Sequence, residues 1–127
     1  MRDILICSAN DNFLTALRPA SGEGDVRITV CRRPMEAVRA LMALSFDRLI
    51  LDLETPGLDS LFLISIARRI NPHLPVVAIA SRPVIEGRAV QHKGVAFHLV
   101  PPTANHDLAR MITLGVEELG SALEPAG

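Results

Sequence analysis

Five short strand-like runs, each followed by a segment with helical spacing, are the feature that most constrains the fold of this chain. The runs cover residues 4–7, 25–31, 48–51, 75–80 and 95–100. Continuous apolar runs of this length are typical of strands buried on both faces, and the alternating pattern of residues 25–31 is typical of an edge strand. Strands that alternate with helices form a parallel sheet with helices on both sides. The sequence therefore predicts an α/β fold with a five-stranded parallel sheet.

The segments that follow the five runs carry the helix signals. Pro34 and Asp59 suit the first positions of two helices, and Gly94 suits the end of another. A last helix is predicted from the spacing of apolar residues between positions 108 and 119. Five strands and five helices, in strict alternation, account for almost the whole chain.

The length of 127 residues suits one domain. We expect this domain to span residues 1–122 and residues 123–127 to form a frayed C-terminal tail. Cys7 and Cys31 lie in two of the strand-like runs and are predicted to be buried thiols.

Charge and composition exclude two classes of partner. The chain has 13 basic and 14 acidic residues, with 3% aromatic residues. This balance provides neither the basic surface nor the stacking platforms that nucleic-acid binding requires. No apolar run approaches the roughly 18 residues of a membrane span, and the apolar run near the N-terminus is too short for a signal peptide. We therefore expect a cytoplasmic protein that binds neither nucleic acid nor membrane.

Residues 47–59, which run from the third strand through Asp52 and a Pro56-Gly57 turn into a helix, resemble the receiver domains of response regulators (CheY-like domains). Residues 71–77 resemble the entry into the family's fourth strand, and residues 94–102 its fifth strand and the proline that follows. The resemblance covers the whole chain. It implies a flavodoxin-like fold of five βα units with the strand order 2-1-3-4-5.

The resemblance also implies phosphoryl transfer from a histidine kinase to Asp52, with Mg²⁺ beside it. Such a site uses an acidic pair after the first strand, a hydroxyl after the fourth and a lysine after the fifth. In this sequence the acidic pair falls on Ser8 and Ala9, the hydroxyl on Ala80 and the lysine on Pro101. All four positions are degenerate.

Lys93 is the only lysine among the 13 basic residues. It precedes the fifth strand and is therefore expected a strand length from the site, about 20 Å. The sequence thus predicts a pseudo-receiver, which is not an enzyme, holds no metal or cofactor and acts through contacts with a histidine kinase or a regulatory protein.

The alternative is an atypical receiver that is still phosphorylated on Asp52. In that case Mg²⁺ is bound, Asp11 reaches toward it, Ser81 bonds the phosphoryl group and Arg82 replaces the lysine. A purely structural role is a further alternative, in which Asp52 bonds Thr55 or nearby backbone amides of the turn. Because no like charge is expected beside it, we expect the pKa of Asp52 to stay close to its ordinary value of about 3.9.

Four apolar residues are predicted to face outward on two neighbouring helices and are interface candidates, also for a homodimer: Phe62, Ile66, Met35 and Met42. Adjacent exposed apolar side chains mark an interaction surface. The alternatives are that Phe62 or Ile66 packs under a neighbouring helix, and that the family's more usual surface, around the fourth helix and fifth strand, is the interface.

His98 occupies the aromatic switch position of the family's fifth strand and is a candidate switch residue. A flavodoxin-like enzyme or ligand-binding domain is the weakest alternative. No glycine-rich phosphate loop follows the first strand, and no nucleophile–base pair stands at a strand end.

Overall fold

The computed structural model describes residues 2–17 and 26–101. The helix expected between residues 108 and 119, the limit of the domain at residue 122 and the tail at 123–127 lie outside the described residues. The strands are β1 (Arg2–Cys7), β2 (Val26–Cys31), β3 (Arg48–Asp52), β4 (Val76–Ala80) and β5 (Ala96–Leu99). The helices are α1 (Asp11–Leu17), α2 (Pro34–Ala43), α3 (Ser60–Ile70) and α4 (Ile85–His92).

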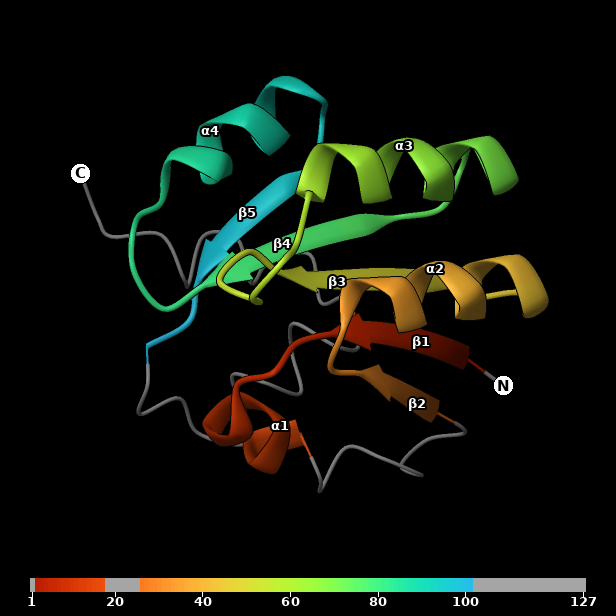
Figure 1. Cartoon of the computed structure of the whole chain (residues 1–127), viewed down its shortest axis with the longest axis horizontal. Helices are drawn as coiled ribbons and strands as arrows, with labels where there is room; N and C mark the ends of the chain where they lie inside the picture. Colours follow the sequence, from red (N-terminus) through yellow and green to blue (C-terminus); the bar gives the residue numbers. More distant parts are fainter. Residues whose placement is uncertain (1, 18–25, 102–127) are drawn as a thin grey trace.

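All five strands are parallel and lie in the order β2-β1-β3-β4-β5, which confirms the predicted topology. Helices α2, α3 and α4 cover one face of the sheet and α1 lies on the other (Figure 1). The carboxyl ends of the strands meet at one edge, on the left in Figure 1. The loops after β1, β3 and β4 meet there.

The strand side chains alternate between two cores. Leu5, Leu49 and Leu51 contribute to the core under α2, α3 and α4. Ile4 and Ile50 contribute to the core on the side of α1. β1 and β3 are therefore buried on both faces, which is why their sequences are continuous apolar runs.

β1 begins earlier than the sequence predicts. Arg2 and Asp3 pair in the ladder with Val26 and Arg27 of β2, although both are charged. Their side chains lie at the exposed start of the strand, where hydrophobic patterning gives no signal. Hydropathy thus located the buried part of the strand and missed its solvated end.

The turn between β3 and α3 follows from its sequence. Gly57 has a φ of 75°, and the N–H of Leu58 donates to the carbonyl of Thr55 at 3.2 Å. Glycine adopts this conformation without strain, and proline suits the position before it in such a turn. Asp59 then caps α3, because its Oδ1 accepts from the N–H of Phe62 at 3.0 Å. This geometry fixes where α3 starts relative to Asp52.

In the part of the chain that the structure describes, none of the helices combines the length and the apolar character needed to cross a bilayer.

Candidate functional site

Asp52 ends β3 at the carboxyl edge of the sheet and is only 4% exposed. Its Oδ2 accepts a hydrogen bond from the hydroxyl of Ser8 at 2.7 Å. Its Oδ1 accepts from the backbone N–H of Glu54 at 3.0 Å. Each oxygen of the carboxylate therefore already has a donor from the chain itself.

Ser8 follows β1, the strand beside β3, and is fully buried. Besides donating to Asp52, its hydroxyl oxygen accepts from the N–H of Asn10 at 3.1 Å, and its own N–H donates to the carbonyl of Cys31 at 3.0 Å. In the sequence, Ser8 stands out only as a position at which an acidic residue is missing. The structure shows that it is a donor that ties the loop after β1 to Asp52.

The pKa of Asp52 is raised, so the expectation of an ordinary value was wrong. Burial is the main cause, because a charged carboxylate loses hydration away from water. The bonds from Ser8 and from the Glu54 amide act to lower the pKa, and the nearby charge of Glu54 raises it. The expectation failed because it considered like charges but not burial.

Asp52 bonds a backbone amide of the turn that follows β3, as its purely structural alternative role requires. The side chain bonds the backbone N–H of Glu54, two residues on, as in an Asx turn. The N–H of Thr55 donates to the backbone carbonyl of Asp52 at 3.1 Å and not to its side chain. The carboxylate thus stabilises the turn after β3.

Glu54 forms a bridge to the loop after β4 that the sequence pattern does not predict. Its Oε2 accepts from the N–H of Ser81 at 2.8 Å and from the hydroxyl of Ser81 at 2.7 Å. Its Oε1 accepts from Nε of Arg82 at 3.0 Å. Burial acts to raise the pKa of Glu54, but the bonds from Ser81 and Arg82 together outweigh it and lower the pKa.

The two residues considered as phosphoryl partners therefore contact Glu54 in this structure. Ser81 uses both its donors on one carboxylate oxygen, and Arg82 binds the other. The strand order is the one signal that could have predicted these contacts with Glu54. Because β3 and β4 are neighbours, residues just past their carboxyl ends lie side by side.

Asp11 lies in the first turn of α1 and does not reach Asp52. Its Oδ1 forms an exposed ion pair with Nη2 of Arg32 at 2.7 Å. Lys93 ends α4 and precedes β5. The parallel pairing of Ala96 with Val77 places that end of β5 beside the start of β4, away from the carboxyl edge.

The remaining family positions carry no charge. Ala80 is buried at the end of β4, Ala9 is exposed after β1, and Pro101 is exposed just beyond β5. His98 lies on β5 opposite Ile79 and is half-buried. Its role as a switch stays a prediction.

The hollow above Asp52 has a volume of about 10 Å³. It is lined by Asn10, Asn12, Phe13, Asp52, Ile79, Ala80, Ser81, Val100 and Pro101. A cavity of roughly this volume holds one water molecule. The hollow beside Asp52 is therefore small, and the carboxylate at its edge is already bonded by Ser8 and Glu54.

The side chains near Asp52 do not fit a Mg²⁺ site. Mg²⁺ requires octahedral oxygen coordination that includes carboxylates. The carboxylate of Glu54 is bonded by Ser81 and Arg82, and that of Asp11 is paired with Arg32. Among the described residues, no three His, Cys, Asp or Glu side chains group in a way that could hold a metal.

Three of the four interface candidates are exposed on α2 and α3. Phe62 is 57% exposed, Met35 59% and Met42 73%. Ile66 differs, because it is half-buried and packs against the core under α3. The alternative of inward packing thus holds for Ile66 and not for Phe62.

The raised pKa of Asp52 predicts a pH dependence of stability. A carboxyl whose pKa is higher in the folded than in the unfolded state contributes stability below the unfolded pKa, here 3.8, and this contribution is lost as the pH rises through the folded pKa. Asp52→Asn has no such group. The variant should therefore gain stability relative to the parent as the pH rises above about 3.8, and the gain should level off once Asp52 of the folded parent is fully ionised.

Urea unfolding of both proteins over that pH range measures the difference. Glu86→Gln, which removes an exposed carboxylate on α4, controls for the loss of one negative charge. A difference between Asp52→Asn and the parent that is flat, or that falls with rising pH, would contradict the raised pKa.

Comparison with known proteins supports the fold alone. The sequence matches no protein-family model and no curated protein. Among solved structures, the chain is similar to a CheY-like response regulator receiver domain protein from Methanospirillum hungatei JF-1, with a TM-score of 0.72 and 15% identity, covering 96% of this chain and 98% of that one.

Two further structures are similar over nearly their full length. The phosphorylated cyanobacterial phytochrome response regulator RcpA has a TM-score of 0.71 and 18% identity, with 98% of this chain and 96% of that one covered. The response regulator TrrA from Thermotoga maritima, in complex with Mg²⁺ and BeF, has a TM-score of 0.69 and 20% identity, with 94% and 99% covered. At these identities, the chain shares the receiver-domain fold with all three.

Proposed function

We propose that this chain is a receiver-like signalling domain of a two-component system that acts through protein contacts and is not efficiently phosphorylated. The structural neighbours named response regulators support the signalling class. One observation carries the proposal that Asp52 is not efficiently phosphorylated: both of its carboxylate oxygens accept hydrogen bonds from the chain itself, from Ser8 and from Glu54. In this proposal the domain is not an enzyme and holds no metal or cofactor. It works in the cytoplasm with a histidine kinase or a regulatory protein.

The energetics of phosphoryl transfer support this proposal. Transfer depends almost entirely on positioning and on charges that stabilise the moving phosphoryl group. Loss of one preorganised donor or cation commonly lowers the rate on the order of 10²-fold, and several such losses do not simply multiply. Here Ser8 and Ala9 stand at the metal-ligand positions and Pro101 at the lysine position. The remaining hydroxyl, that of Ser81, bonds Glu54.

A phosphorylatable receiver is the second candidate. It is favoured by one observation, namely that Ser81 and Asp52 line the same hollow. Phosphorylation through this arrangement requires that Ser81 leave Glu54 and that the hollow widen. Arg82, now bonded to Glu54, would then be the nearest replacement for the lysine.

A phosphorylation assay separates the two candidates. The protein is incubated with acetyl phosphate and Mg²⁺ and its intact mass is measured, with Asp52→Asn treated in parallel. We expect no phosphoryl adduct on either protein, whereas a response regulator receiver treated in the same way acquires one. An adduct on the parent that is absent from Asp52→Asn would establish the second candidate instead.

A further inference from the structure

A groove of about 870 Å³ lies between α2 and α3, next to the turn that follows Asp52. Its apolar lining comes from Met35 and Val38 of α2 and from Phe62 and Leu63 of α3. Val38 and Leu63 are buried at its base, whereas Met35 and Phe62 are more than half exposed. The groove thus has a formed apolar floor and two large apolar side chains at its opening.

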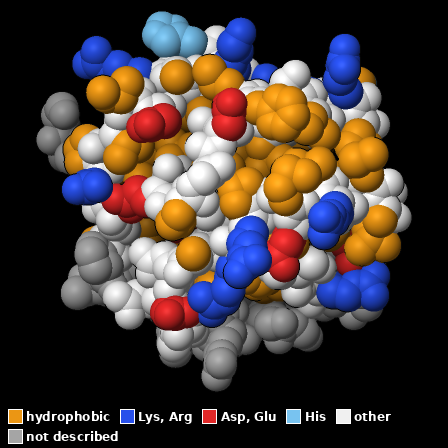
Figure 2. All heavy atoms as spheres, viewed as in Figure 1, with side chains coloured by type: hydrophobic (Ala, Val, Ile, Leu, Met, Phe, Trp, Pro, Cys, Tyr) orange, Lys and Arg blue, Asp and Glu red, His pale blue; other side chains and the backbone are white. Residues whose placement is uncertain are grey.

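The apolar side chains belong to a larger patch on one face of the molecule. Met42 lies on α2 two turns after Met35 and is also exposed. Figure 2 shows hydrophobic side chains gathered over α2 and α3, with Lys and Arg side chains around them. Exposed patches of this kind mark interaction surfaces.

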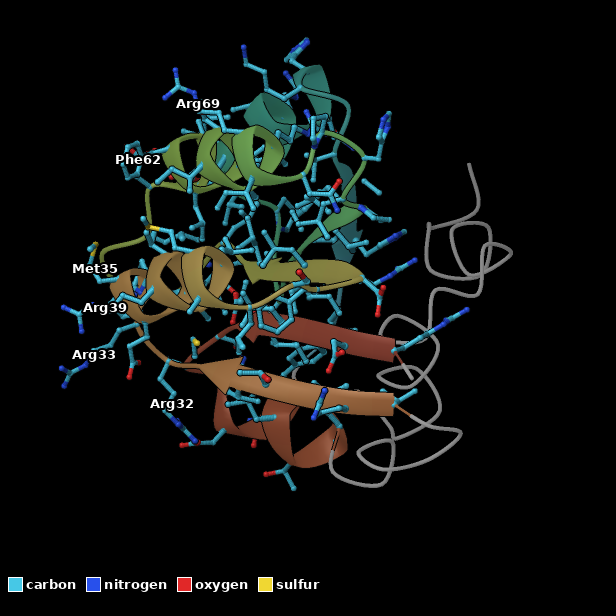
Figure 3. All side chains as sticks on the ribbon, turned by 90° about the vertical axis from the view of Figure 1, so that its right-hand side faces the viewer. Arg32, Arg33, Met35, Arg39, Phe62 and Arg69 are labelled. Carbon is cyan, nitrogen blue, oxygen red and sulfur yellow. The ribbon has the colours of Figure 1, made fainter. Side chains whose placement is uncertain are left out.

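Arginines lie on the face that carries the groove, and Arg32 and Arg33 line the groove itself. Arg32, Arg33, Arg39 and Arg69 project from the same face as Met35 and Phe62 (Figure 3). Arg32 is paired with Asp11. Within the described part of the chain, the side chains of the other three arginines form no ion pair.

The acidic side chains of this face are already bound to backbone. Asp59 accepts from the N–H of Phe62 at 3.0 Å, and Glu36 accepts from the N–H of Arg33 at 3.1 Å. These bonds hold the two carboxylates at the first turns of α3 and α2. Both carboxylates keep their charge, but the three arginines that form no ion pair within the described part of the chain outnumber them, and guanidinium groups recognise carboxylates through paired N–H donors.

The spacing of these residues defines the shape of the partner. Met35, Arg39 and Met42 stand at i, i+4 and i+7 on α2, and Phe62 and Arg69 at i and i+7 on α3. Apolar and cationic groups thus follow the two helices in helical steps: Met35 and Phe62 line the groove, and Arg39, Met42 and Arg69 lie beyond it along the helices. A groove of this kind takes an amphipathic helix that inserts apolar residues at i, i+3 or i+4, and i+7.

We propose that the α2–α3 groove is the docking site for an acidic amphipathic helix of another protein. The apolar face of that helix contacts Met35 and Phe62, and its flanking Asp or Glu residues pair with Arg33, Arg39 and Arg69. This inference deepens the proposed function, because it assigns the contact surface of a domain that signals without phosphorylation.

Two other occupants fit less well. A second copy docked through the same face by twofold symmetry would place the same arginines near one another, which electrostatic complementarity disfavours. A lipid surface would contact the projecting Met35, Phe62 and Met42 but would leave the apolar floor of the groove, Val38 and Leu63, unfilled.

A library of helical peptides displayed on phage, random at every outward position, is selected for binding to the full chain. We expect the enriched peptides to carry large apolar residues at helical spacing with Asp and Glu beside them. The best peptide is then synthesised with a fluorophore, and its affinity is measured by anisotropy at low and at high salt. The affinity should fall as salt rises, because the flanking contacts are ionic.

Variants locate the binding site. Phe62→Ser should weaken binding about tenfold or more, since an aromatic residue at the centre of an interface contributes most of its energy. The double variant Arg33→Gln and Arg39→Gln should weaken binding several-fold and reduce the dependence on salt. Ile85→Ser and Arg88→Gln, which change exposed residues of α4, are the matched controls and should leave binding unchanged. Circular dichroism and thermal melting establish that each variant is folded.

Four outcomes would overturn the proposal. The first is a selection that returns no peptide sensitive to Phe62→Ser, and the second is enrichment of basic peptides. The third is a change in the elution volume of the chain with Phe62→Ser, which would indicate a homodimer. The fourth is co-sedimentation with phosphatidylglycerol vesicles that depends on Phe62, which would indicate a membrane surface. The mass assay reports on Asp52 and the peptide assay on the α2–α3 groove, so a phosphoryl adduct and a failure of peptide binding are separate results.

Discussion

Ser8→Asp is expected to lower the free energy of unfolding by about 3 kcal/mol in the absence of divalent cations. The Ser8 hydroxyl donates to Oδ2 of Asp52 at 2.7 Å, and both residues are buried. The substitution removes the donor and places a second carboxylate against the first, so at least one of them must take up a proton or remain as an uncompensated buried charge. Mg²⁺ should restore a large part of the loss, because two facing carboxylates are the ligands this cation prefers.

Urea unfolding in EDTA and in excess Mg²⁺ measures both effects. Ser8→Ala is the matched control: it loses the same hydrogen bond, at a cost of about 2 kcal/mol for a bond to a charged group, but brings no new carboxylate. Its stability should therefore be the same with and without Mg²⁺. If Ser8→Asp were as stable as the parent in EDTA, the contact between Ser8 and Asp52 would not be a close one.

Local sequence predicts the fold of this chain well because the apolar runs, the turn glycine and the helix-capping residue all indicate the same elements. Ile4 to Cys7 and Leu49 to Leu51 are buried on both faces, so each strand shows as an unbroken apolar run. Gly57 needs a positive φ and Asp59 caps a helix, so both leave local signals. The solvated start of β1 left no such signal and was missed.

The candidate site was only partly predictable. Asp52 and the degenerate positions are single residues that alignment with a family identifies, and their places in the sequence fix the strand end at which they lie. The bonds of Asp52 with Ser8 and of Glu54 with Ser81 join residues far apart in the chain. Such bonds depend on strand order, on side-chain rotamers and on burial, none of which the local pattern of apolar and polar residues specifies. For the same reason the pKa of Asp52 was misjudged.

Rebuilding the missing parts should convert the chain into an efficient phosphate acceptor. The combined variant carries Ser8→Asp and Ala9→Asp for the metal, Pro101→Lys for the phosphoryl charge and Glu54→Ala. The last change releases the hydroxyl of Ser81, which now donates to Glu54 at 2.7 Å, and removes a carboxylate whose charge raises the pKa of Asp52. With acetyl phosphate and Mg²⁺, the rate of adduct formation should rise about 10²-fold or more above that of the parent.

Intact mass over time measures this rate. Two further variants test whether the adduct forms on Asp52 and whether Glu54 controls its rate. Adding Asp52→Asn to the combined variant should abolish the adduct, which assigns the phosphoryl group to this carboxylate. Restoring Glu54 alone should slow the reaction, because the Glu54 carboxylate again takes both donors of Ser81. A combined variant that folds, binds Mg²⁺ and still forms no adduct would show that the metal ligands, lysine and hydroxyl are not what the site lacks. The cause would then lie in the size of the hollow above Asp52, about 10 Å³, most of whose lining, including Phe13, Ile79 and Val100, these changes leave in place.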